Sequence, residues 1–451
     1  MKKISTFIIV VICIGVAVAL GFGTYKYLDK KYTDTNEQDK KPTEKEPENP
    51  SNPPKEYTET DYNVKLIKTV NSTQDGNYLI SPYSIEIALN MLKDGAKEDS
   101  YKQIEDVIGT REIPVFNVKD RISVTNGAFI KEEYKDYVSS SYYDKLATYD
   151  AELIFDKFTS PDKINNWVKE HTYGMIPKIL DEMSKDFILG LANAVAIDVK
   201  WADEFECQYT KSNKFTKSDG STMDVEMMRK VYERGNTKYI ETEDAKGIII
   251  PYLSYDKNGE VEYNSSESEF TSLEFVGILP NGKVNDYIEN LTNEKLKTLD
   301  EKAIGTDKVI IDLNIPRFAY SFDLKNFMDV LKAMGIKDVF DENKANLTGI
   351  MSVDDVKKVD PDAYNIYVST AIHKTYIDLN EKGTKAAAVT YFGIEKATSS
   401  IDPNKKERKQ IVFDKPFIYM IRDTKSKEIL FFGVVEQPNE WKGSTCSNKE
   451  E

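Results

Sequence analysis

Residues 381–390 read EKGTKAAAVT, and no other stretch says as much about the fold and use of this chain. They follow a strand-like run at residues 375–379 and turn at Gly383, the residue type whose backbone bends most freely. Small residues without proline come next, so the segment could lie exposed as a loop and later pair as a strand. Alanine, lysine and glutamate also suit a turn of helix, and the residues alone leave both interpretations open.

As a strand with a period of two, the segment would have one face of small or apolar side chains. That inward face consists of Thr384, Ala386, Ala388, Thr390, Phe392 and Ile394. Lys385 points outward, and the first charge on the inward face is Lys396. The pattern therefore favours a loop that can enter a crowded sheet.

Six further segments, in a fixed order, complete the pattern. They are LISPYSIEIALNMLKDGAKEDSYKQI at 79–104, INNWVKEHTYGMI at 164–176, ILGLANAVAIDVKW at 188–201, VEMM at 225–228, IPRFAYSFDLKNFMDVLKAMGIKDVFDENKANLTGI at 315–350 and FDKPFIYMIRDTKSKEILFFGVV at 413–435. With them, the chain resembles the serpins, the serine protease inhibitor family, over roughly residues 58–438. In this resemblance EKGTKAAAVT is the hinge of the reactive loop.

The resemblance implies an α+β serpin fold with about nine helices and three β-sheets. A large central sheet A would carry an exposed reactive loop, and the serpin domain would span residues 58–439. Residues 440–451 form a polar tail. We expect a monomer.

The N-terminus has the pattern of a targeting segment. Lys2 and Lys3 precede an apolar run at about residues 7–22, near the lower length limit of a membrane span. Because no clean cleavage site follows, residues 1–33 are interpreted as an uncleaved membrane anchor in preference to a cleaved signal. Residues 34–57 are predicted to be a disordered polar linker. The domain would then be extracytoplasmic, either anchored by an N-terminal helix or secreted.

Composition excludes several classes of function. The net charge of −15 over 451 residues, without a basic stripe, argues against nucleic acid as a partner. Three cysteines, Cys13, Cys207 and Cys446, are no disulfide framework. Whether Cys207 and Cys446 pair stays open, with two unpaired thiols as the default expectation.

The chain offers little for catalysis. It has two histidines, His171 and His373, and no G-x-S-x-G motif, so we predict that it is not an enzyme and uses no cofactor or metal. Residues 256–260 only faintly suggest a calcium loop. A hairpin turn at Asn258 and Gly259 is the preferred interpretation.

The resemblance assigns two polar clusters in sheet A. A buried shutter, which holds the central strands together where they must part, maps onto Ser81, Ser84, Asn193 and His373. A breach, where the loop enters the sheet, maps onto Trp201, Arg317 and Glu381. Arg317 stands where the family often has lysine. Its pair with Glu381 could be partly buried or a surface ion pair.

The resemblance also implies irreversible suicide-substrate inhibition of an extracytoplasmic serine protease, by loop cleavage and insertion into sheet A. The hinge would comprise Glu381, Gly383, Thr384, Ala386, Ala387, Ala388 and Thr390. Seventeen positions counted from Glu381 place the reactive bond between Ala397 and Thr398, which suits elastase- or subtilisin-like enzymes.

Other positions of the reactive bond stay open. Lys396 would suit trypsin-like enzymes. Counting back from Pro416 points near Lys405 instead, because this loop is longer than is typical of the family. The basic run at residues 405–409 would also suit trypsin-like enzymes, but a solvated spacer is its preferred interpretation. The alternative function is a non-inhibitory serpin-fold protein with a binding or chaperone-like role.

Overall fold

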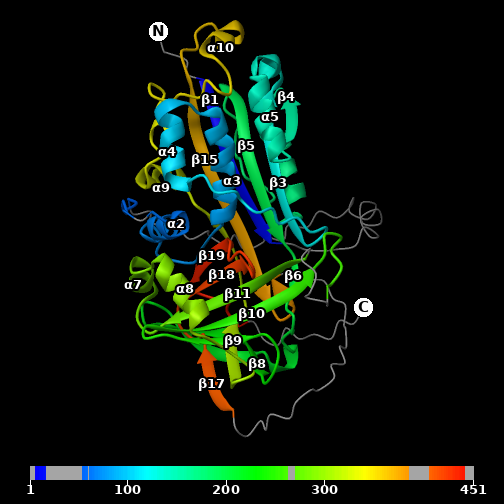
Figure 1. Ribbon diagram of the computed structural model, residues 1–451, viewed down its shortest axis with the longest axis vertical. Helices are drawn as coiled ribbons and strands as arrows, with labels where there is room; N and C mark the ends of the chain where they lie inside the picture. The colour runs from blue at the N-terminus through cyan, green and yellow to red at the C-terminus, as the bar shows by residue number, and fades with distance from the viewer. Residues whose placement is uncertain (1–5, 17–52, 59, 263–269, 385–405, 442–451) are drawn as a thin grey trace, which may run out of the picture.

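The computed structural model describes residues 6–16, 53–58, 60–262, 270–384 and 406–441. Within them, nine α-helices and three β-sheets form the expected α+β serpin fold (Figure 1). The α-helices are α2 (Tyr62–Asn71), α3 (Pro82–Gly95), α4 (Glu98–Ile108), α5 (Ser140–Thr148), α6 (Asp162–His171), α7 (Val284–Glu289), α8 (Asn293–Glu301), α9 (Phe327–Met334) and α10 (Val353–Val359). Short 3-10 helices are η1 (Glu132–Tyr137), η2 (Cys207–Tyr209) and η3 (Asp338–Phe340).

Sheet A is the large sheet whose long strands run along the upper half of the molecule in Figure 1. Its order is β4-β3-β5-β1-β15-β16-β6, with β14 paired to β15. The strands are β4 (Glu152–Asp156), β3 (Ile122–Lys131), β5 (Phe187–Ile197), β1 (Thr6–Val16), β15 (Ile366–Asn380), β16 (Gly383–Thr384), β6 (Val199–Lys200) and β14 (Phe318–Asp323).

The centre of sheet A follows from its sequence. Every residue of β5 is buried, as expected of an apolar run covered on both faces. From His373 to Leu379, β15 alternates between buried and partly exposed residues, so His373 lies on its buried side. The helix α3 packs against β5 and β1, and this places its N-terminus beside the middle of the sheet.

Strand β1 fills the space between β5 and β15. It is parallel to both, and the backbone of Ile12 lies between Asn193 and His373. The sequence predicted a signal or anchor in this region. Within the described residues, no helix has the length and apolar character needed to cross a membrane. The role of residues 1–33 in targeting or anchoring stays a prediction.

Sheets B and C occupy the lower half of Figure 1. Sheet B contains β12 (Ala303–Gly305), β9 (Lys238–Glu241), β10 (Ala245–Tyr255), β11 (Thr271–Pro280), β18 (Phe417–Asp423), β19 (Ile429–Val435) and β2 (Tyr78–Ile80), in that spatial order. Sheet C contains β17 (Glu407–Val412), β13 (Val309–Pro316), β8 (Thr222–Tyr232) and β7 (Lys211–Thr216). The predicted closing hairpin is β18 and β19, whose turn is held by Asp423 accepting from the Lys425 and Ser426 N–H groups.

Two local predictions can be compared with the structure. Residues 256–260 form a turn in which the Asp256 N–H donates to the Glu260 carbonyl and Gly259 has a φ of +83°, as the hairpin interpretation requires. The expectation of two unpaired thiols is wrong, because Cys207 is disulfide-bonded. Nothing in the spacing of the cysteines indicated this bond.

Candidate functional site: hinge, breach and shutter of sheet A

The hinge begins as a strand. Gly383 and Thr384 form β16, which pairs antiparallel to β15 on one side and to β6 on the other. Thr384 is fully buried, as expected of the inward face, and Lys382 is exposed. The Thr384 hydroxyl is hydrogen-bonded to the hydroxyl of Tyr252. Burial raises the pKa of Tyr252, so this phenol keeps its proton.

The remaining loop predictions lie outside the described residues. They are the hinge residues Ala386, Ala387, Ala388 and Thr390 and the reactive-bond candidates Lys396, Ala397 and Thr398. The described chain resumes at Lys406, whose ammonium donates to the carbonyls of Glu233 and Thr306. Arg408 bonds to Asp312, so the basic run after the loop begins strand β17 and is tied to sheet C.

The three predicted breach residues lie together. Arg317 donates from Nε to the Glu381 carboxylate at 2.6 Å. Glu381 is only 4% exposed, so this pair is partly buried and is not a surface ion pair. Trp201 holds the residues on either side of Glu381, because its indole N–H donates to the Asn380 carbonyl at 2.9 Å and its backbone N–H donates to the Lys382 carbonyl at 3.0 Å.

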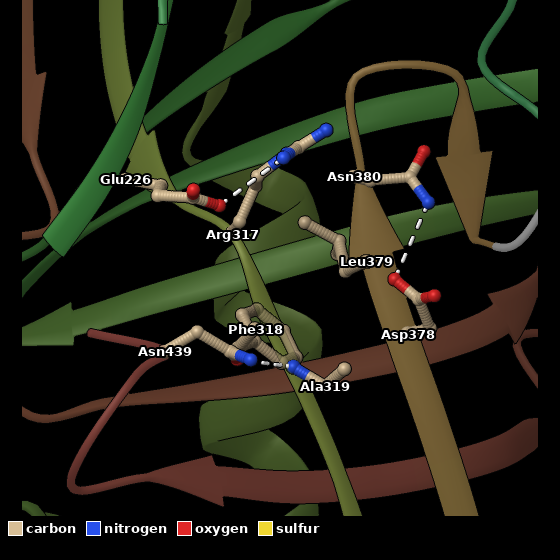
Figure 2. A pocket seen from close by; sticks show the side chains of 8 residues that line it. All are labelled: Glu226, Arg317, Phe318, Ala319, Asp378, Leu379, Asn380 and Asn439. Atoms are coloured by element: carbon tan, nitrogen blue, oxygen red, sulfur yellow. Dashed lines mark hydrogen bonds and ion pairs between the residues drawn. The ribbon is translucent and has the colours of Figure 1, made fainter. Parts of the chain in front are cut away.

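Three partners of the breach were missed by the sequence reasoning. Glu226 accepts from Arg317 Nη1 at 3.1 Å, as Figure 2 shows. The Thr210 hydroxyl donates to Glu381 Oε1 at 2.6 Å. Tyr252 stacks on Trp201 with ring centroids 4.5 Å apart. These residues lie far from the hinge in sequence, and a polar or aromatic residue on a strand gives no local signal of such a role.

A cavity of about 260 Å³ adjoins the breach (Figure 2). Its walls include Glu226 and Arg317 on one side and the end of β15 on the other. Asn439, in the segment after β19, also lines it and accepts the Ala319 N–H at 2.6 Å. The C-terminal segment therefore contacts the place where the loop would enter.

The four predicted shutter residues lie around the N-terminus of α3. Pro82 occupies the first helical position, and Ser81 caps the helix by accepting the Ser84 N–H at 3.2 Å. The Ser84 hydroxyl donates to the Asn193 side chain. Asn193 in turn donates to Asn126 at 2.8 Å, a fifth member that the sequence did not reveal.

The His373 side chain contacts this cluster through the backbone of Ser81. The Ser81 N–H donates to His373 Nε2 at 3.2 Å, so the imidazole proton is on Nδ1. Burial lowers the pKa of His373 to about 3, and the ring is therefore neutral at physiological pH. His373 and Asn193 do not bond to each other in the structure, because the backbone of β1 runs between their strands.

Comparisons with known proteins bear on the fold and the family. A family model described as "Serpin (serine protease inhibitor)" matches residues 57–438. A "Serine protease inhibitor" of Cyanea capillata is 28% identical over 393 residues, which are 80% of this chain and 92% of that protein.

Solved structures show the same fold. The native state of the thermophilic serpin tengpin superposes with a TM-score of 0.66 at 29% identity, covering 86% of this chain and 97% of tengpin. Thyroxine-binding globulin, solved with thyroxine, gives a TM-score of 0.65 at 22% identity, over 84% of this chain and 98% of that protein.

Proposed function

The chain belongs to the serpin family, and from that premise we propose that it is an irreversible suicide-substrate inhibitor of a serine protease. The protease attacks the reactive bond and forms an acyl-enzyme. The freed arm of the loop then inserts into sheet A before deacylation and carries the protease away. Inhibition is thus a race between insertion and hydrolysis, driven by the free energy stored in the uninserted sheet. In this mechanism the protease supplies the catalytic groups.

The observation that carries the proposal is strand β16. Its first residues already pair antiparallel to β15, the direction that an inserting loop needs, because the hinge turns back on the strand it follows. The buried Thr384 is small and uncharged, and the next residues in the sequence continue that pattern. Insertion would extend this existing strand, so the first backbone pairs of the inserted strand would not have to form anew.

The register of β16 also supports the position of the reactive bond. Thr384 pairs with Leu379, and each step forward along the loop is one step back along β15. Thirteen steps forward reach Ala397, and thirteen steps back reach Ile366, the first residue of β15. An arm that ends at Ala397 would therefore pair along the whole strand, which favours cleavage between Ala397 and Thr398.

The target follows from this bond. An alanine before the bond suits elastase- or subtilisin-like enzymes, and Lys396 remains the alternative for trypsin-like enzymes. The count from Pro416 loses support, because Lys406 and Arg408 are engaged with sheet C. We place the protein outside the cytoplasm, because disulfides such as that of Cys207 persist in oxidising compartments.

One observation favours a second candidate, a non-inhibitory serpin-fold protein that binds a ligand or another chain. Strand β1 pairs with β5 from Phe187 to Ile197 and so fills most of the space that the loop would enter. If β1 never leaves, the loop cannot insert beyond its first residues. The protein would then be cleaved without trapping a protease.

The deciding experiment mixes the full chain with elastase-, subtilisin- and trypsin-like proteases and seeks an SDS-stable complex on a gel. Thr384→Arg should convert inhibitor into substrate, because burying its charge costs several kcal/mol, about 2–7 even for a neutral polar group. Ala386→Arg serves if the first variant does not fold. The exposed Lys382→Arg is the matched control and should inhibit normally. A stoichiometric complex with both inward arginine variants would rule the mechanism out.

A further inference from the structure

Tyr252 contacts the first inward residue of the hinge. It lies on β10 of sheet B, and its hydroxyl is 2.5 Å from the hydroxyl of Thr384 on β16. Tyr252 is 2% exposed and Thr384 is fully buried, so the pair lies away from solvent. Among the described residues, neither hydroxyl has a second hydrogen-bond partner. Removing either one would therefore leave the other as an unpaired polar group inside the protein.

The ring of Tyr252 is fixed by its own neighbours. Trp201 stacks on it, with ring centroids 4.5 Å apart and the ring planes 8° from parallel. The backbones of the two residues form a bridge, and the Ala202 N–H donates to the Pro251 carbonyl at 3.0 Å. Because sheet B and Trp201 hold the ring, its hydroxyl stays at one position beside β16.

The stacked pair contacts the hinge in two different ways. Trp201 donates to two backbone carbonyls at the turn, those of Asn380 and Lys382. Such contacts would form with almost any side chain at these positions. Tyr252 bonds to the side chain of Thr384 instead, and this bond requires a hydroxyl at position 384.

The side-chain contact matters because backbone pairing repeats along a strand. Thr384 pairs with Leu379 and Val199, yet a shift by one residue would form the same kind of backbone hydrogen bonds. That shift would turn every side chain of the strand to the opposite face and bring the charge of Lys385 to the buried position. A hydroxyl that bonds to Tyr252 distinguishes the observed register from the shifted ones.

We propose that Tyr252 is a positioning residue of the hinge. Its hydroxyl fixes the register from which the reactive loop inserts, and it selects a hydroxyl side chain at position 384. Loss of this contact should not slow the attack of the protease on the loop, because that step precedes insertion. It should increase the share of loops that are cleaved and released, since an arm that starts out of register must withdraw before it can insert.

Hydrogen exchange tests the contact without any protease. Tyr252→Phe leaves the Thr384 hydroxyl unpaired, so the amides of Gly383 and Thr384 should exchange at least roughly tenfold faster. Thr384→Val alone should have the same effect, because it leaves the Tyr252 hydroxyl unpaired. The double variant has no unpaired hydroxyl and should exchange slowly again, and Thr384→Ser should match wild type. Unchanged exchange in both single variants, or no recovery in the double variant, would overturn the proposal.

Tyr142→Phe is the matched control for the loss of a buried hydroxyl. Tyr142 lies on α5, is 1% exposed, and donates one hydrogen bond to the Met91 carbonyl at 3.0 Å. This variant should lose stability, yet its hinge amides should exchange as in wild type. Faster exchange at the hinge in Tyr142→Phe would show that general destabilisation explains the effect and would contradict a specific role of Tyr252.

The effect on inhibition rests on the proposed function and is measured separately. In Tyr252→Phe, the number of inhibitor molecules consumed for each protease inactivated should rise at least roughly threefold, while the rate constant of loop cleavage stays unchanged. The double variant with Thr384→Val should return to the wild-type ratio. An unchanged ratio in Tyr252→Phe would contradict the role of Tyr252 in insertion. No complex with any protease, with the exchange pattern present, would instead refute the inhibitory function alone.

Discussion

Gly383 has a φ of +153°, a backbone conformation that residues with a side chain rarely adopt. A Cβ at this position would lie 2.2 Å from the Val199 carbonyl oxygen, so β6 would have to move away from β16. We predict that Gly383→Ala displaces the hinge at a cost of about 1–3 kcal/mol and raises the share of inhibitor that is cleaved without trapping. Titration of protease with inhibitor measures that share. Gly282→Ala, in open space with an ordinary φ, is the control and should inhibit normally.

His373 makes stability depend on pH. Its folded-state pKa of about 3 lies below the unfolded value near 6.5, so the unfolded chain binds more protons between these values. Stability should therefore fall as pH falls from 6.5 towards 3, by up to about 1.4 kcal/mol per pH unit from this one group. Urea unfolding at pH 7 and pH 5 measures the loss, and His373→Gln should reduce it by about 2 kcal/mol.

A direct observation of the imidazole complements the unfolding experiment. His171→Gln leaves His373 as the single histidine of the chain. Its NMR signals should then show no titration between pH 7.5 and pH 5, because the neutral ring accepts the Ser81 N–H. A midpoint near 6 would show that the ring is solvated and that the shutter is not closed as the structure has it.

The resemblance assigned Ser81 and Ser84 to the shutter and Arg317 and Glu381 to the breach, and the structure gives each the neighbours described above. Their partners Asn126, Thr210, Glu226 and Tyr252 could not be predicted, because each contact joins residues more than 60 positions apart in sequence. A side chain buried by tertiary pairing has no periodic signature of its own. Sequence patterns could therefore indicate small inward residues such as Thr384, but not the residues that contact them across the sheet.

Among the elements, two segments were interpreted differently from their observed form. The apolar run near the N-terminus was predicted to be a signal or anchor, and the structure places Thr6–Val16 as a strand. Short apolar runs suit buried strands as well as helices, so periodicity alone cannot decide. The basic run that begins β17 was interpreted as a solvated spacer, because its pairing with β13 joins segments far apart in sequence.

The position of β1 in sheet A leads to a prediction for the chain without this strand. Deleting residues 1–33 should empty the space between β5 and β15 and increase the rate of complex formation, by roughly tenfold if β1 contributes about 1.4 kcal/mol to the barrier. Val11→Pro is the matched point variant, since Val11 pairs with both Ala192 and Ile372 and proline cannot donate within a central strand. Stopped-flow measurements of protease loss give the rates. Equal rates for all three proteins would mean that β1 does not occupy the sheet in solution.

At the scale of the whole molecule, inhibition requires a metastable native fold. If cleavage lets residues 383–397 pair along β15, sheet A gains a full central strand with its backbone hydrogen bonds and buried small side chains. We predict that a single cut between residues 394 and 406 raises the melting temperature by roughly 10 °C or more, several kcal/mol for a domain of this size.

Calorimetry of the intact and cut protein measures the change in melting temperature. Thr384→Arg, cut at the same bond, is the control, since its arm cannot enter the sheet and its melting temperature should hardly change. If the cut native protein melts at the same temperature or lower, no free energy is stored in the intact sheet. A serpin fold without stored free energy could still bind a ligand. Its loop could not insert faster than the acyl-enzyme is hydrolysed, so it could not trap a protease.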